Sequence, residues 1–235
     1  TQREDGSWRE DPAVTALVVI GMLGSGQEGY GPRSVVVTRA LDYIRRFAKP
    51  DGSIYDRYYP CYSTSVALLA LAEAGLPQDR ELIRRGKRFL LDLQADESEG
   101  FTPESADYGG WGYEASSSRE AARRADLSNT QMVLEAFKAA GLSKDDPAYK
   151  DVVVFLTRCQ NNSETNDQAF AGTDGGGVYN PSESKAGEYV KPDGTKGLRS
   201  YGSMTYALLK SMIYANLSKD DPRAVSYTHL TLPTN

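Results

Sequence analysis

The chain has 235 residues with a net charge of −5, 25% charged residues and 40% hydrophobic residues, which is typical of a globular protein. No basic stripe is present, so nucleic acid is not an expected partner. The longest apolar run, AVTALVVIGML, is well short of the roughly 20 residues that a transmembrane segment needs. Two cysteines and one histidine fit neither a disulfide framework nor a metal-ligand spacing, so we expect no metal and no cofactor.

A short turn rich in glycine and aromatic residues occurs four times along the chain. Its copies read DGSW, DGSIY, ADYGGWGY and DGGGVY, beginning at Asp5, Asp51, Ala106 and Asp174. A glutamine precedes all but the second, where Ala48 takes its place. Glycine permits a tight backbone, and a glutamine can bind backbone groups at helix ends, so we predict a structural role. The residues expected to build these turns are Gln2, Asp5, Gly6, Trp8, Gln94, Gly110, Trp111, Gln160 and Gly175.

Each turn is followed by an apolar segment that starts at a threonine. Eleven residues after each threonine stands a glycine or an asparagine. These pairs are Thr15 and Gly26, Thr64 and Gly75, Thr130 and Gly141, and Thr205 and Asn216. Because glycine and asparagine tolerate the left-handed conformation that ends many helices, the pattern predicts four helices of about three turns. They are apolar almost all round, which indicates burial on both sides.

An amphipathic helix is predicted after each of the first three apolar helices. Its apolar residues recur at the spacing of one helix face, centred on Tyr43, Phe89 and Phe155, and charged residues occupy the other face. Stacking such hairpins places the apolar helices inside and the amphipathic helices outside. The inner helices carry few charges, which favours a closed ring over an open superhelix.

The Gln-x-x-Asp-Gly-x-Trp turns resemble the QW repeats of squalene–hopene cyclases and the related prenyltransferase repeats, over residues 2–224. The resemblance implies an all-α fold, an α/α-toroid of repeated helical hairpins with inner and outer rings around an apolar cavity, as in terpenoid cyclase-like proteins. The chain has fewer hairpins than a complete toroid. We therefore expect one repeat domain over residues 1–224 that is truncated, and incomplete at both ends.

The two ends of the chain carry little information on fold or compartment. The first residue is Thr1, so the start looks trimmed and no localisation is indicated. Residues 225–235, VSYTHLTLPTN, carry no charged residue and resemble a translated sequencing adapter of the kind that contaminates metagenomic assemblies. The alternative is a genuine disordered polar tail.

The candidate catalytic residue is Asp126. Squalene–hopene cyclases protonate an alkene with an Asp-x-Asp-Asp-Thr motif, and the resemblance places DLSNT, residues 126–130, at that position. Asp126 and Thr130 match the motif, but Ser128 stands where the proton donor is expected and Asn129 where its partner is expected. Serine cannot act as the strong acid that an alkene requires. The alternative role of Asp126 is a helix cap.

Tyrosines gather at the predicted starts of the inner helices. Their rings can hold an isoprenoid chain, stabilise a carbocation or contact a sugar, and ordinary packing is the alternative. The residues expected to line a ligand cavity are Tyr58, Tyr59, Tyr62, Ser128, Asn129, Thr130, Tyr201 and Ser203.

The leading hypothesis for function is a squalene cyclase-like or prenyltransferase-like protein that binds an isoprenoid or another apolar small molecule. An enzymatic activity, as an isomerase or a prenyltransferase, is left open. The zinc ligands of prenyltransferases have no match here, because Asp56 and Cys61 have the wrong spacing. Two alternatives remain. One is a non-catalytic repeat module that binds a protein or a glycan through the loops at residues 114–125 and 180–200. The other is a carbohydrate-active α/α-toroid enzyme.

Overall fold

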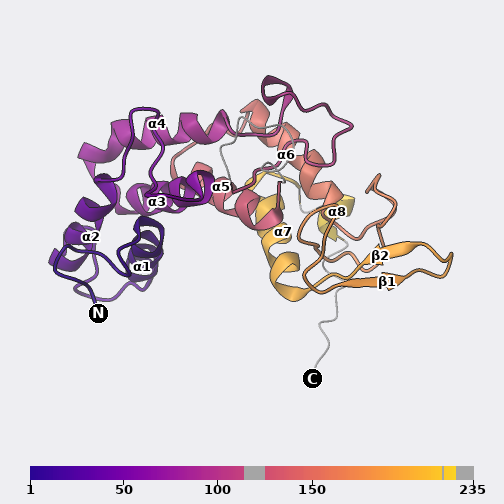
Figure 1. The fold of residues 1–235 in the computed structure, drawn as a ribbon, viewed down its shortest axis with the longest axis horizontal. Helices are drawn as coiled ribbons and strands as arrows, with labels where there is room; N and C mark the ends of the chain where they lie inside the picture. The colour runs from indigo at the N-terminus through magenta and orange to yellow at the C-terminus, as the bar shows by residue number, and fades with distance from the viewer. Residues whose placement is uncertain (114–124, 219, 226–235) are drawn as a thin grey trace. The chain divides into compact units, whose positions relative to one another are not determined.

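The computed structural model of the chain is mostly helical and describes residues 1–113, 125–218 and 220–225 (Figure 1). Its described residues form two compact units. The first unit contains residues 1–93, 112–113 and 132–142. The second unit contains residues 94–111, 125–131, 143–218 and 220–225.

The first unit contains two helical hairpins and the end of a third inner helix. Its elements are α1 (Pro12–Gly24), α2 (Val35–Arg45), α3 (Pro60–Ala74), the short 3-10 helix η1 (Pro77–Asp79) and α4 (Arg80–Leu91). Helix α1 packs against α2 and α3, and α4 packs against α3 (Figure 1). Their shared core includes the fully buried Val19, Leu41, Ile44 and Leu71.

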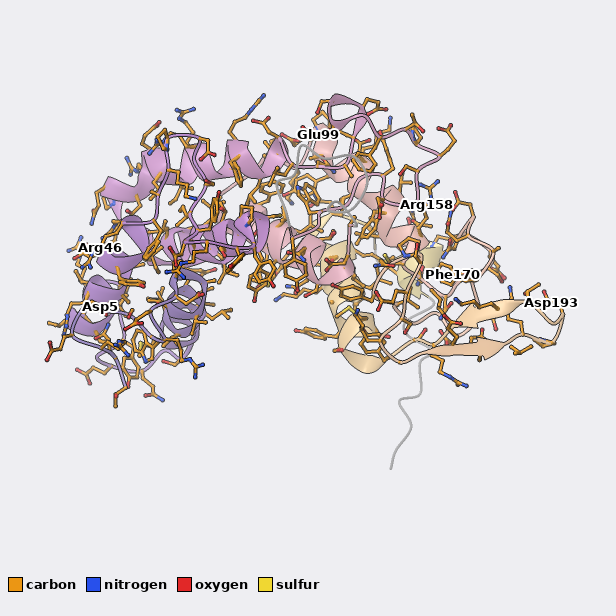
Figure 2. All side chains as sticks on the ribbon, in the orientation of Figure 1. Asp5, Arg46, Glu99, Arg158, Phe170 and Asp193 are labelled. Atoms are coloured by element: carbon orange, nitrogen blue, oxygen red, sulfur yellow. The ribbon has the colours of Figure 1, made fainter. Side chains whose placement is uncertain are left out.

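The second unit contains the remaining helices and a small sheet. Its elements are η2 (Glu97–Glu99), the beginning of α5 (Leu127–Ala139), α6 (Pro147–Arg158), β1 (Glu188–Val190), β2 (Lys196–Leu198), α7 (Gly202–Tyr214) and α8 (Pro222–Val225). Strands β1 and β2 form an antiparallel hairpin in which Tyr189 lies opposite Gly197. Asp193 lies at the tip of this hairpin (Figure 2).

The four predicted inner helices are confirmed as α1, α3, α5 and α7. Each begins about three residues before its threonine, with proline at the first position of α1 and α3. The predicted stop residues all have left-handed backbone, with φ between 61° and 66°. They are Gly26, Gly75, Gly141 and Asn216. Local backbone chemistry therefore determines where these helices end.

The amphipathic helices are confirmed as α2, α4 and α6, and α8 occupies the corresponding place after α7. On α6 the predicted stripe is buried at every position. Its residues are Ala148, Tyr149, Val152, Phe155, Leu156 and Cys159. The fold is thus an all-α repeat of the α/α-toroid class. The β1–β2 hairpin is a small addition within the predicted loop at residues 180–200.

The prediction that the inner helices are buried on all sides is confirmed for α3, where most residues are buried. It is wrong for α1 and α7. Leu17 on α1 is 43% exposed, and Tyr206 and Ile213 on α7 are 68% and 62% exposed. The contacts of α1 with α2 and α3 cover only part of its surface. An apolar sequence therefore does not establish that every face of a helix is covered.

The threonine of each inner helix is bonded to the preceding turn. In all four repeats its hydroxyl oxygen accepts a hydrogen bond from a backbone N–H of the turn. The donor–acceptor pairs are Trp8–Thr15, Ile54–Thr64, Trp111–Thr130 and Gly177–Thr205, at 3.0, 2.9, 3.1 and 3.0 Å. This bond places every turn over the beginning of its inner helix.

The turn glycines allow a close approach to the outer helix of the same repeat. Gly109 has φ +85°, and a Cβ there would lie under 3.0 Å from the carbonyl group of Asp151 on α6. Gly6 and Gly52 have the same relation to Arg39 and Arg85, which occupy the equivalent positions of α2 and α4. A side chain is therefore excluded by both conformation and contact.

The turn glutamines join the glycine turn to the first residues of an outer helix. The Gln94 side-chain amide donates to the carbonyl oxygens of Gly109 and Ala148, at 2.9 and 3.0 Å. Gln2 donates to Gly6 and Val36, and Gln160 donates to Gly175 and Arg223, in the same way. The acceptors lie in α2, α6 and α8 as well as in the turns, so each glutamine links two segments of one repeat.

Candidate functional site

The DLSNT segment forms the first turn of α5 in the second unit. The Asp126 N–H donates to the carbonyl oxygen of Trp111 at 3.0 Å, and the Leu127 N–H donates to that of Tyr179 at 2.8 Å. The backbone at the start of α5 is thus held by the turns of two successive repeats.

Asp126 is buried, with 2% of its surface exposed, and its carboxyl group accepts several hydrogen bonds. One oxygen accepts from the Asn129 backbone N–H at 2.9 Å, and the other accepts from the Asn129 side-chain amide at 2.8 Å. The Tyr179 hydroxyl and the Ser128 N–H also bond to it. Burial raises the pKa of Asp126 above its usual range, and these hydrogen bonds act in the opposite direction.

The bond from the Asn129 N–H to Asp126 has the geometry of a helix N-cap. Asp11 makes the equivalent bond at the start of α1, accepting from the Val14 N–H at 2.9 Å. The aspartate four residues before the threonine therefore caps the inner helix in both the first and the third repeat. What distinguishes Asp126 is its burial.

Asn129 and Thr130 are both fully buried beside Asp126, and Ser128 is half-buried. Within the described part of the chain, the side-chain carbonyl oxygen of Asn129 has no hydrogen-bond partner. The hydroxyl of Thr130 is occupied by the Trp111 backbone. Of the residues predicted at this segment, only Asp126 and Asn129 have side chains bonded to each other.

Two of the predicted cavity residues lie at the start of α7. Tyr201 is the N-cap residue of α7 and is half-buried, whereas Ser203 is exposed. Burial raises the pKa of the Tyr201 hydroxyl, and the charges of Glu183 and Asp126 raise it further. Tyr201 is therefore within electrostatic range of Asp126 in the second unit.

The three other predicted tyrosines lie in the first unit. Tyr58 and Tyr59 are 70% and 51% exposed, and Tyr62 is half-buried on α3 against the core. All three line a cavity of about 420 Å³ at the starts of α1 and α3. The predicted cavity residues thus belong to two groups, one in each unit.

Sequence reasoning missed two tyrosines, Tyr113 and Tyr179, which occupy the same position of successive turns. The Tyr113 carbonyl oxygen accepts from the Cys61 N–H at 3.4 Å at the start of α3, as that of Tyr179 does from Leu127 at the start of α5. The Tyr113 ring contacts Tyr59 and Tyr62, while Tyr179 bonds to Asp126. Each of them stands two residues after the turn residue whose N–H donates to the threonine, Trp111 or Gly177. This shared position in the repeat is the sequence signal that could have identified them.

Of the two long loops that precede α5 and α7, the structure describes mainly the second. Most of the loop at residues 114–125 lies outside the described residues. The loop at 180–200 contains the β1–β2 hairpin, and the buried Asn161 bonds to the Leu198 carbonyl oxygen and the Ser200 hydroxyl, at 2.8 and 2.7 Å. Phe170, Val178 and Leu198 form a small core beside it.

Within residues 1–113, 125–218 and 220–225, no group of three or more His, Cys, Asp or Glu side chains is placed to hold a metal ion. Among the same residues, no helix combines the length and the apolar character needed to cross a bilayer.

Repeated hairpins with inner and outer helices, joined by glutamine- and glycine-containing turns, define this chain as an α/α-toroid repeat protein. The profile described as "Squalene-hopene cyclase C-terminal domain" matches residues 10–180. The chain therefore belongs to the squalene–hopene cyclase family, in agreement with the resemblance of its turns.

Two curated relatives show the same relationship. A squalene–hopene cyclase of Bradyrhizobium diazoefficiens is 31% identical over 160 residues, which is 65% of this chain and 22% of the relative. Lanosterol synthase erg7A of Aspergillus fumigatus is 28% identical over 141 residues, 57% of this chain and 17% of the relative. The matched segment thus spans about a fifth of the length of either protein.

Proposed function

We propose that this chain is part of a squalene cyclase-like protein that binds an isoprenoid or a similar apolar ligand, and that its residues 126–130 do not start a cyclisation. Family membership supports the class of ligand, since one relative is named for squalene and the other for lanosterol. The second part of the proposal rests on the surroundings of Asp126.

The hydrogen bonds of Asp126 are the observation that carries the proposal. An acid that protonates an alkene must direct an O–H group at the double bond in a dry site. Both oxygens of Asp126 instead accept hydrogen bonds from Asn129, one from its backbone and one from its side chain. Ser128 carries an alcohol, which is far too weak an acid for this step. The segment is thus built to begin α5.

Product analysis with a protein that contains this chain tests both parts of the proposal. The protein is incubated with squalene, bound squalene is measured by co-elution, and cyclised products are sought by mass spectrometry. We expect binding, and no product whose formation depends on Asp126. Asp126→Asn is compared with Asp146→Asn, because Asp146 caps α6 through the Ala148 N–H at 3.0 Å.

Two results would contradict the proposal, and they can be told apart. A cyclised product that Asp126→Asn abolishes and Asp146→Asn does not would assign Asp126 as the acid. A protein that retains neither squalene nor shorter isoprenoids would reject the apolar ligand, and would leave the alternative of a binding module or a carbohydrate-active enzyme.

A further inference from the structure

We propose that Glu97, Tyr108 and Asp151 form a proton-sensitive clasp, which holds η2 and the turn of the third repeat against α6 more tightly in acidic than in neutral solution. All three residues lie in the second unit. Glu97 belongs to η2, Tyr108 to the turn and Asp151 to α6. The inference does not depend on the isoprenoid ligand proposed above.

The Tyr108 hydroxyl lies between two carboxyl groups. Its oxygen is 3.1 Å from both carboxyl oxygens of Glu97 and 3.2 Å from Oδ1 of Asp151. A phenol carries one hydrogen, so it donates to only one of the two carboxylates at a time. When it donates to Glu97, the contact with Asp151 is a hydrogen bond only if Asp151 carries a proton and donates to the phenol oxygen. The complete chain of hydrogen bonds therefore needs a second proton.

The surroundings of the clasp keep one hydrogen on the phenol and favour a proton on Asp151. Tyr108 is 5% exposed, and burial, Glu97 and Asp151 raise the pKa of its hydroxyl well above the usual range. Burial also raises the pKa of the half-buried Asp151, against the effect of its bond with Tyr108. The negative charges of Glu97 and Asp96 raise this pKa further, and the positive charge of Lys150 on α6 lowers it.

The clasp adjoins the turn that positions the start of α5. A Cβ on Gly109 would lie under 3.0 Å from the carbonyl group of Asp151, so the turn and α6 are already in close contact there. Two residues further along the turn, the Trp111 carbonyl oxygen accepts from the Asp126 N–H at 3.0 Å. A proton on the clasp therefore stabilises the segment that supports the beginning of α5.

The contribution of the clasp to stability falls as the pH rises. The folded protein holds the Asp151 proton more strongly than the unfolded chain does. The clasp therefore contributes fully below the unfolded pKa of Asp151, and this contribution is lost as the pH rises through the folded pKa. Asp151→Asn imitates the protonated carboxyl group at every pH, because its amide can always donate to the phenol oxygen.

Amide hydrogen exchange of residues 97–109, measured by mass spectrometry on the full chain, tests the proposal. Parent and variant are compared at the same pH, so that intrinsic exchange rates cancel. We expect Asp151→Asn to exchange at the rate of the parent at about pH 4, and at least about threefold more slowly at about pH 7. Asp145→Asn, which removes an exposed carboxylate just before α6, is the matched control and should follow the parent at both. The same ratio of rates at both pH values, or an equal effect of Asp145→Asn, would overturn the proposal.

Tyr108→Phe tests the part of the hydroxyl. Without it, Asp151→Asn still relieves repulsion from Glu97 but cannot complete the chain of hydrogen bonds, so its effect at neutral pH should fall to about half or less. An undiminished effect would show that repulsion alone causes the pH dependence, and would overturn the clasp. If Tyr108→Phe loses its helical circular dichroism, NMR of the carboxyl carbons decides. Asp151 should then titrate at a higher pH in the folded than in the urea-unfolded protein, and equal midpoints would overturn the proposal.

Discussion

The hydroxyl oxygen of Thr130 accepts a hydrogen bond from the backbone N–H of Trp111 at 3.1 Å, and both residues are buried. The same bond recurs in the three other repeats. A buried N–H without an acceptor is costly, so the threonine satisfies a group that no helix or strand can reach. This explains why each apolar segment begins with threonine and not with valine, which has the same shape.

Thr130→Val is therefore expected to lower the free energy of unfolding by about 1–3 kcal/mol, the cost of leaving one buried N–H unsatisfied. This loss of stability is measured by urea denaturation, with circular dichroism as the signal. Thr38→Val, at a half-buried position of α2, is the matched control and should cost less than half as much. Equal losses in the two variants would show that the bond contributes nothing of its own.

The helix repeat was predictable from the sequence because its signals are local. Gly75 and Asn216 end their helices through their own backbone preferences, and the stripe around Phe155 follows from helical periodicity alone. The β1–β2 hairpin was also within reach, since Asp193 and Gly194 form a turn signal between short alternating segments. The absence of an apolar helix pattern over residues 180–200 indicates only a loop.

The surroundings of the candidate site could not be predicted in the same way. Tyr179 contacts Asp126 from a turn about fifty residues further along the chain, and Tyr113 reaches α3 from the turn of the next repeat. Such contacts join segments of neighbouring repeats, and no local preference of Asp126 or Tyr62 specifies them. The motif thus indicated where a site lies, but not what its side chains touch.

Gly109→Ala is expected to destabilise the protein by about 3 kcal/mol or more, because a left-handed backbone and a steric clash combine. A Cβ there would meet the carbonyl group of Asp151. Gly100→Ala separates the two effects, since Gly100 has φ +83° and no other group within 4 Å of a Cβ. It should cost about 1 kcal/mol. Thermal denaturation of both variants provides the comparison, and similar losses would refute the close approach.

Asp126→Asn is expected to fold with little loss of stability, whereas Asp126→Ala should lose about 1–2 kcal/mol with the cap. The new amide can still accept from the Asn129 N–H. Its NH₂ group can donate to the side-chain carbonyl oxygen of Asn129, which has no partner among the described residues. Urea denaturation at neutral pH compares the two variants. If both lose the same amount, the carboxylate charge matters more than the cap.

The pH dependence of the Asp126→Asn variant provides a separate prediction. The pKa of Asp126 is raised in the folded protein, so the native state holds this proton more strongly than the unfolded chain does. As the pH rises from the unfolded value through the raised folded value, Asp126 lowers the free energy of unfolding. The variant should therefore gain stability relative to the parent protein across that window. A constant difference would show that Asp126 does not titrate there.

Arg158 joins two loops of the second unit to the end of α6 (Figure 2). It is 6% exposed, its guanidinium binds Asp167 at 2.7 and 2.9 Å, and it donates to the carbonyl oxygens of Ser105 and Pro103 at 2.6 and 2.8 Å. Arg158→Met is expected to lower the free energy of unfolding by about 2–3 kcal/mol, because the bonds from the buried guanidinium to Asp167 and to two loop carbonyl groups are lost together.

The loss caused by Arg158→Met should shrink at low pH without vanishing. The hydrogen bond from Arg158 lowers the pKa of Asp167, so this pair stabilises the protein above the unfolded pKa and is lost as the pH falls through the folded one. The carbonyl bonds do not titrate and remain. Arg84→Met, which breaks an exposed pair with Glu81, is the control and should change little at any pH. Urea titrations at acidic and neutral pH measure both variants, and a pH-independent loss for Arg158→Met would show that Asp167 contributes nothing.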